Sequence, residues 1–494
     1  MAFDISEITK YADLVSADAN IQRQLWSESI SLDARNENPM ADFIGGEKSG
    51  KPIIEKRDLA AGGSAKVHFT TTAPVGGRGV MAGNELKSKT AKLVFGTFSV
   101  TVDLRRFAIS EDQLVELLRF SNGETRESVL YDLCKQWWGM MEADDLQITL
   151  RNKALFASSQ PNVLRVGNRA NLDAIKLTDT FDVGTIEAGK RKLIGQGAMP
   201  MKVDTDKSGS QVPQFCVFAP NEFSVSLEDE QKFREALNNN QQRGEDAFYW
   251  TGKYPMWKNN LINRHNIIWD AGNKKQGSPL LPIAFLGEAM ADATPTDMTG
   301  GGAHNTAGTL TDTVLYDYFS HFGGYYWKTY DLESAPTDNN TYYALIYNVT
   351  GADAGKYEIV SWAAAGNNGN TITVTREVNG SSQKTKLTAA GLYSNAHPSG
   401  SWIIPCNKYG VPIGRALHFG AEALFLAKGS IDAEEIEWKD DFVAKGSGRA
   451  HINSSGIQGI RGYAPYEDSI GRYPNFILVE GALDYGLTLL DTSL

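Results

Sequence analysis

Cysteine is scarce in this sequence of 494 residues. The three that occur, Cys134, Cys216 and Cys406, are far apart and odd in number. They provide neither an even disulfide framework nor the close ligand spacing of a zinc site. We therefore expect synthesis in a reducing compartment such as the cytoplasm.

Long apolar runs and a targeting segment are also missing. No stretch approaches the ~18 apolar residues of a membrane-spanning helix. The first residues, MAFDISEITKYADLV, lack the basic and apolar regions of a signal peptide. We expect a protein that is soluble when made and has no membrane partner.

An excess of positive charge is absent as well, because the formal net charge is -11. A protein whose main task is to grip nucleic acid is usually basic. Direct and sequence-specific DNA binding is therefore not the expected function. An acidic protein can still enclose DNA, since an inner wall does not need to bind it tightly.

No set of residues forms a recognisable catalytic or metal site. The seven histidines are scattered without an HExxH pair, and the paired acids Asp144-Asp145 and Asp440-Asp441 are adjacent, as on a solvated face. The spacing at Gly446-Ser447-Gly448 is wrong for a nucleophile elbow. We predict no catalytic residue, no cofactor and no metal, and hence no enzyme.

Glycine, by contrast, is abundant. It accounts for 48 of the 494 residues, about one in ten, against a usual share of about 7%. Residues 1–46 read as an arm in which Asp4 and Glu7 form a capping box before an amphipathic helix. Within residues 47–109, apolar and polar residues alternate in KVHFTTTAP and again in KLVFGTFSVTVDLRRFAI. This alternation predicts a long β-hairpin. Its tip, VGGRGVMAGNEL, lacks the GK[ST] of a phosphate loop.

A long helix is predicted from about Glu124 to Ala154, and a shorter one begins at the capping box of Ser110 and Gln113. Apolar residues recur at helical spacing along one side of this long helix, which predicts that this side packs into the protein core. The predicted core positions are Leu130, Leu133, Trp137 and Met141.

The remaining chain is mixed. A helix is expected through Val183 and Leu193, a buried strand at Phe215–Phe218, and a helix around Leu227–Leu237. Residues 290–400 contain TYYALIYNV, KYEIVSW and NTITVTREV and read as a small all-β insertion. GRALHFGAEALFLAKG predicts an apolar helix, and FILVEGALDYGL a final strand.

Several stretches resemble the coat proteins of tailed phages with the HK97-type fold, in the branch related to short-tailed phages. They are GGRGVMAGNELKSKTAKLVFGTFSVTVDLRRFAIS, FCVFAPNEFSVSLED, GRALHFGAEALFLAKG and GIQGIRGYAPYEDSIGRYPNFILVEGA. Their order and spacing carry the resemblance, which covers most of the chain outside 290–400.

The resemblance implies an α+β, HK97-like capsid fold with an inserted small β domain. Its parts are an N-terminal arm (1–46), an extended β-loop (47–109), a peripheral domain with a spine helix (110–179), an axial domain (180–289 and 401–430), the insertion (290–400) and a returning β segment of the peripheral domain (431–494). The implied function is a major capsid protein, located in the virion.

The same resemblance implies that the main partner is the chain itself, in hexamers and pentamers that form an icosahedral shell around double-stranded DNA. Because no long charged leader precedes the arm, a separate scaffolding protein is expected, together with a portal. Whether cement proteins bind is left open. The residues expected at subunit interfaces are Gly76, Gly77, Arg78, Gly79, Gly83, Lys87, Lys89 and Trp26.

One alternative belongs to another class, a phage tail or surface protein that binds carbohydrate through the insertion. Its aromatic residues Trp327, Tyr342, Tyr343 and Trp362 could stack on sugars if they are exposed. Burial of these side chains would instead indicate a structural β core.

Overall fold

The computed structural model describes the chain in segments. These are residues 34, 37–46, 49–59, 64–70, 95–112, 126–155, 157, 159–204, 211–235, 256–265, 269–270, 275–276, 279–281, 284–285, 307–311, 341–348, 357–363, 371–375, 397–398, 401–429, 437–440, 452–468 and 471–483. The chain divides into two compact units, one of Met1–Leu146 with Glu422–Tyr473, the other of Gln147–Ala421 with Pro474–Leu494.

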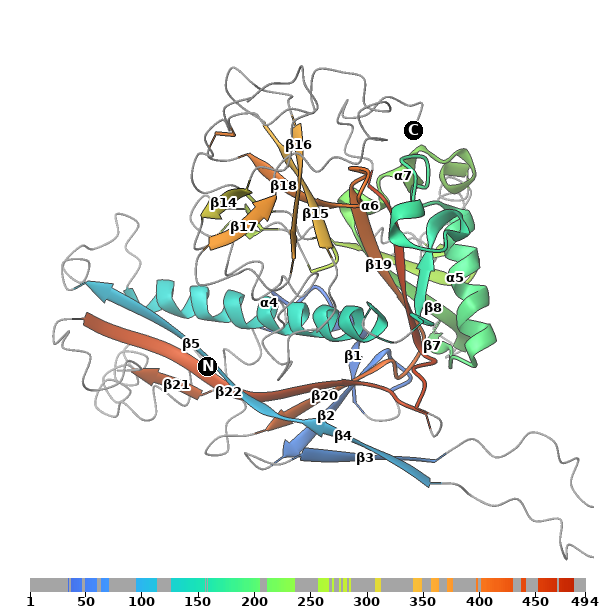
Figure 1. Cartoon of the computed structure of the whole chain (residues 1–494). Helices are drawn as coiled ribbons and strands as arrows, with labels where there is room; N and C mark the ends of the chain where they lie inside the picture. The colour runs from blue at the N-terminus through green and yellow to red at the C-terminus, as the bar shows by residue number, and fades with distance from the viewer. Residues whose placement is uncertain are drawn as a thin grey trace, which may run out of the picture. The chain divides into compact units, whose positions relative to one another are not determined.

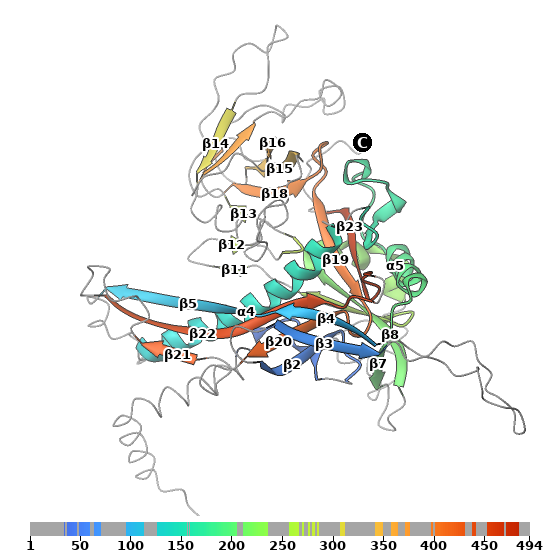
Figure 2. The same ribbon diagram turned by 60° about the horizontal axis from the view of Figure 1, so that its bottom comes forward.

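A six-stranded sheet forms the centre of the first unit. Its order is β1 (Ile44–Gly45), β2 (Ile53–Leu59), β20 (Leu424–Gly429), β22 (Ile452–Pro465) and β21 (Glu437–Asp440), and β5 (Asp103–Asp112) also pairs with β22. The 14 residues of β22 thus join strands from both ends of the sequence. Figures 1 and 2 show β5 and β22 running side by side along the helix α4.

The long helix is confirmed as α4, which spans Arg126–Leu155. At 1.5 Å per residue its 30 residues extend about 45 Å. The predicted helix start at Ser110 is wrong, because Ser110 lies in β5 opposite Ser454 of β22. A capping-box pattern alone cannot outweigh ten strand residues that gain a full ladder of backbone hydrogen bonds.

The predicted hairpin is confirmed for its described strands, β3 (Ser64–Thr70) and β4 (Phe95–Thr101). They pair antiparallel from Ser64↔Thr101 to Thr70↔Phe95. β2 does not join this pair; it runs parallel to β20 in the six-stranded sheet. The tip between Thr70 and Phe95 lies outside the described residues.

The second unit contains a seven-stranded sheet. Its order is β6 (Val163–Arg165), β23 (Phe476–Ala482), β19 (Ile413–Phe419), β8 (Gln211–Pro220), β10 (Asn260–His265) and β9 (Met256–Trp257), with β7 (Met201–Asp204) also paired to β8. The helix α5 (Val183–Gln196) begins at the N-cap Asp182 and ends at Gly197, whose φ of 82° suits glycine. The helix expected around Leu227 is broken into α6 (Asn221–Ser224), α7 (Ser226–Asp229) and a turn at 231–235.

The predicted helix in GRALHFGAEALFLAKG is wrong, because the segment forms β19 and β20. Every residue of both strands is buried. A strand that is buried on both faces reads as a continuous apolar run, which periodicity cannot tell from a buried helix. Gly420 follows β19, and a Cβ there would lie 2.1 Å from the carbonyl oxygen of Met199.

A second sheet of the same unit contains the three β-type runs of the 290–400 region. Its order is β13 (Ala284–Phe285), β18 (Trp402–Cys406), β15 (Thr341–Tyr347), β16 (Tyr357–Ala363), β17 (Thr371–Thr375) and β14 (Ala307–Thr311). β13 and β18 lie outside 290–400. Leu345, Ile359 and Ile404 belong to one core cluster with Phe215 and Ile477, so this sheet shares its core with the seven-stranded sheet. A separate inserted domain stays a prediction.

No helix in the described part of the chain is both long and apolar enough to cross a membrane.

Candidate subunit-contact surfaces

The residues expected at subunit interfaces all lie outside the described residues. They are Trp26 in the arm and Gly76, Gly77, Arg78, Gly79, Gly83, Lys87 and Lys89 in the hairpin tip. Their role stays a prediction. The structure does describe the β3–β4 pair that carries the tip, and α4, which lies along the β5–β22 pair.

The predicted core stripe of α4 is only partly right. Leu133 is 46% exposed, so its place in the core was wrong. Trp137 and Met141 are half-buried and pack against the cluster formed by Cys134 and Trp138, while the side chain of Leu130 is not described. The helix is therefore rotated so that Trp138, 1% exposed, is the deeper tryptophan.

Charged side chains line the contact between α4 and the sheet of the first unit. Arg461 of β22 lies 3.3 Å from Glu142 and 5.0 Å from the centre of the Trp138 ring. Arg105 of β5 lies 3.3 Å from Asp145. Both ion pairs are buried or nearly so. Buried ion pairs of this kind favour one position of α4 along the strands β5 and β22 more than they add to stability.

Tyr463 of β22 lies in the same charged contact. Burial raises the pKa of its hydroxyl well above the ordinary value, and the carboxylates of Asp145 and Glu142 raise it further. The phenol therefore stays protonated, and it adds no third negative charge beside these two carboxylates.

The root of the N-terminal arm is anchored on α4 at Gly139. A Cβ at Gly139 would lie 2.3 Å from the carbonyl oxygen of Ala34 and 2.9 Å from the Cβ of Glu37. Asn38 donates to Glu142 at 3.4 Å, one turn further along α4. Because glycine has no side chain, the arm can come close to the helix backbone at this position. We call this close contact of Gly139 with Ala34 and Glu37 the notch.

Gly139→Ala should lower the free energy of unfolding by about 1 to 3 kcal/mol, because the new methyl group overpacks a contact with backbone atoms. In an open helix position the same change normally stabilises by up to about 1 kcal/mol. Gly195→Ala on α5 is the matched control, since nothing lies within 4 Å of a Cβ there. Chemical denaturation would compare the two, and stabilisation by both would contradict the notch.

The described residues contain no group of three or more metal-binding side chains. A dense polar cluster that contains a histidine lies in the second unit and is fully buried. His397 contacts Glu358 at 2.9 Å and Asn348 at 2.6 Å, and Ser401 lies 3.1 Å from Asn348. All four are at most 1% exposed. No substrate reaches them, so the cluster anchors the chain before β18 to β15 and β16.

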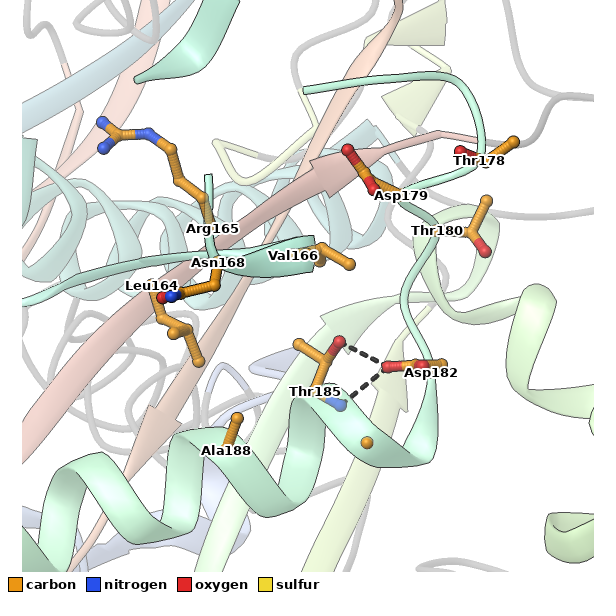
Figure 3. A pocket seen from close by; sticks show the side chains of 12 residues that line it. Leu164, Arg165, Val166, Asn168, Thr178, Asp179, Thr180, Asp182, Thr185 and Ala188 are labelled. Atoms are coloured by element: carbon orange, nitrogen blue, oxygen red, sulfur yellow. Dashed lines mark hydrogen bonds between the residues drawn. The ribbon is translucent and has the colours of Figure 1, made fainter. Parts of the chain in front are cut away.

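A polar pocket of about 440 Å³ lies beside the N-terminus of α5. Figure 3 shows Asp182 accepting hydrogen bonds from the backbone N–H and the hydroxyl of Thr185. Asp179 on the rim is held by Arg169 at 2.7 Å. Burial favours the neutral form of Asp179, but hydrogen bonds from Arg169 and the Lys176 N–H keep its pKa below the ordinary value. The carboxylates of the pocket are thus occupied by structural contacts.

No family model matches the chain, and no curated protein matches it either. Solved structures do match. The capsid of Ralstonia phage GP4 is 12% identical over 90% of both chains, with a TM-score of 0.49. The capsid asymmetric unit of cyanophage Pam1 is 11% identical, covering 91% of this chain and 93% of that chain, with a TM-score of 0.47.

A third match is the head structure of Helicobacter pylori bacteriophage KHP40, 11% identical over 91% of both chains, with a TM-score of 0.46. All three are phage capsids or heads.

Sequence reasoning missed the notch at Gly139 and the charged contact of α4. A glycine within a strong helical pattern was the available signal for the notch, since such a glycine often marks a close packing contact. Nothing in the sequence paired Arg461 with Glu142, which are 319 residues apart.

Proposed function

We propose that the chain is the major capsid protein of a tailed phage and assembles into the hexamers and pentamers of an icosahedral shell around double-stranded DNA. The order of elements is the observation that carries this proposal. An anchored arm root, the β3–β4 ribbon, the 30-residue α4, a mixed α/β unit and the returning β22 follow one another in the chain.

The physical argument rests on what each element can do in an assembly. A two-stranded ribbon is marginally stable by itself and needs another surface. The α4 helix is held to β5 and β22 by apolar packing and by buried ion pairs, which gives a rigid body from which ribbon and arm can reach a neighbour. The partners are other copies of the chain, with a separate scaffolding protein and a portal.

The shell would be part of the virion, with synthesis in the cytoplasm of the host. Carbohydrate binding by the 290–400 region has no observation in its favour among the described residues. Tyr343 packs against the core cluster, whereas the side chains of Trp327, Tyr342 and Trp362 lie outside what is described.

Electron microscopy of the purified protein, alone and co-expressed with its neighbouring genes, tests the proposal. We expect closed shells, or capsomers with six-fold and five-fold symmetry. Persistent monomers or trimers under both conditions would contradict a coat function and favour the sugar-binding alternative. A reducing denaturing gel of the particles would also test for covalent crosslinks through Lys87 or Lys89, which would give a ladder of bands, whereas clean monomers would exclude them.

A further inference from the structure

β5 is a long strand that has one partner, β22, among the described strands. Its ten residues pair with β22 in unbroken register, from Asp103↔Arg461 to Asp112↔Ile452. Within the described part of the chain no strand pairs with its other side. About half of its backbone N–H and C=O groups therefore point away from β22, as in any edge strand. Figures 1 and 2 show β5 at the margin of its sheet.

The two faces of β5 are distinguished by their contacts. Arg105 forms its ion pair with Asp145 of α4, and Phe107 stacks on Trp137 of α4 with ring centres 4.3 Å apart. The odd-numbered residues therefore face α4. Arg106 is exposed and belongs to the opposite face. Because the register has no bulge, Asp112 has its position on the same face as Arg106.

After Asp103 at its first position, the charges of this edge strand are separated by sign. Positive charge follows at Arg105 and Arg106, and negative charge lies at the end, at Glu111 and Asp112. An edge that only had to repel other strands could carry one sign throughout. Separated signs instead make the strand complementary to an antiparallel copy of itself, because like charges then avoid each other and opposite charges meet.

We propose that two copies of the chain pair through β5, antiparallel, about a two-fold axis at Ile109. In this register Arg106 lies opposite Asp112 of the second copy, and the symmetry makes this pair twice. The two-fold axis is perpendicular to the sheet, so residues that lie opposite each other in the two copies must have their side chains on the same face of the sheet. This excludes registers that pair an odd-numbered residue with an even-numbered one. The neighbouring register that meets this requirement, centred on Ala108, would place Arg105 opposite Glu111, but Arg105 is already engaged by Asp145.

This inference deepens the proposed function, on which it rests, by naming a contact between copies. Any contact across a two-fold axis of a shell is isologous, and edge pairing provides such a contact from backbone groups alone. In the register centred on Ile109, residues 106–112 of the two copies overlap, and these seven residues at about 3.4 Å each make a paired edge roughly 24 Å long.

A cysteine at the axis gives the sharpest test. Ile109→Cys particles, mildly oxidised, should give a disulfide-linked dimer, since directly opposed Cα atoms of antiparallel strands lie about 4.5 to 5.5 Å apart. Ala108→Cys is the matched control, because its two copies would be roughly 8 Å apart. The native thiols of Cys134, Cys216 and Cys406 are buried, and burial raises their pKa, so they should not react.

A charge exchange provides the second test. Arg106→Asp should lower the yield of closed shells about tenfold or more, because two acidic groups would then face each other at each end of the pairing. Asp112→Arg should have the same effect. The double variant Arg106→Asp with Asp112→Arg should restore assembly, which a mere loss of folding would not allow.

The outcomes separate the inference from the proposed function. Normal shells of Ile109→Cys without the dimer band would overturn the β5 pairing and leave the coat function standing. Disulfide-linked dimers from both Ala108→Cys and Ile109→Cys would overturn it too, because the pairing would then have no single register. Failure of the double variant Arg106→Asp with Asp112→Arg to form closed shells would also overturn it. An unmodified chain that forms no shell and no capsomer would instead contradict the coat function itself.

Discussion

Glu480→Gln should lower the free energy of unfolding of the second unit by about 3 to 5 kcal/mol. Glu480 lies between two arginines in a row across three neighbouring strands. It is 2.7 Å from Arg415 of β19 and 3.1 Å from Arg165 of β6, and its side chain is 1% exposed. Glutamine keeps the size of the side chain but leaves two guanidinium groups without its negative charge in a dry sheet.

Urea denaturation monitored by circular dichroism would measure this loss. Glu187→Gln is the matched control, because its partner Lys258 is 61% exposed and exposed pairs contribute under about 1 kcal/mol. The triple variant Arg165→Met, Glu480→Leu and Arg415→Met should be close to neutral, since an apolar row of similar volume avoids the desolvation of charge. A small effect of Glu480→Gln together with a large one of Glu187→Gln would refute the argument.

Acid should destabilise the second unit well before its carboxylates are protonated. Burial lowers the pKa of His265 and of His418 to about 3, against an ordinary 6.5. For His418 the positive charge of Lys190 adds to the effect. The ring of His265 stacks on Phe218 with ring centres 3.9 Å apart, and a backbone hydrogen bond with Ala219 opposes the effect of burial on its pKa.

The direction follows from proton binding. Below pH 6.5 the unfolded chain binds a proton at each histidine, while the folded chain stays neutral down to about pH 3. The free energy of unfolding therefore falls as the pH falls, by about 2 kcal/mol per histidine between pH 6.5 and 5. Across the whole interval the loss approaches roughly 5 kcal/mol per histidine.

Denaturation series at pH 7, 6 and 5 would measure the slope. His265→Phe should remove about half of it, because one of the two titrating groups is then lost. Phe218→Leu is the control, since it changes the packing but keeps the titrating group and hence the slope. An unchanged slope in His265→Phe would show that the histidine does not carry the effect.

Sequence patterns predicted well those elements in which one face is apolar. The helices α5 and α4 had such a pattern, and their bounds differ from the predicted ones by a few residues. β19 and β20 are buried on every side, so their apolar run contained no period from which to choose between strand and helix.

Interface residues were harder to predict than secondary structure. Leu133 was placed in the core because its spacing fits the stripe, yet the helix is turned toward Trp138 by Arg461 and Glu142. Ion pairs between distant segments leave no local pattern, and so the sequence could not show this rotation. The charges of Arg106 and Asp112 could be seen in the sequence, but their meaning depends on β5 having β22 as its one partner among the described strands, which only the fold reveals.

The position of β22 also governs the order in which the molecule can be completed during synthesis. β5 and most of α4 leave the ribosome more than 300 residues before β22, their partner in the first unit. At about 5 to 20 residues per second, this interval lasts roughly 15 to 65 seconds. During this interval the backbone N–H and C=O groups on both edges of β5 have no partner among the described strands. The growing chain can therefore pair wrongly at β5, the strand through which we propose that two copies later pair. Protection of nascent chains, more than the stability of the finished subunit, should then limit how much assembly-competent protein a cell yields.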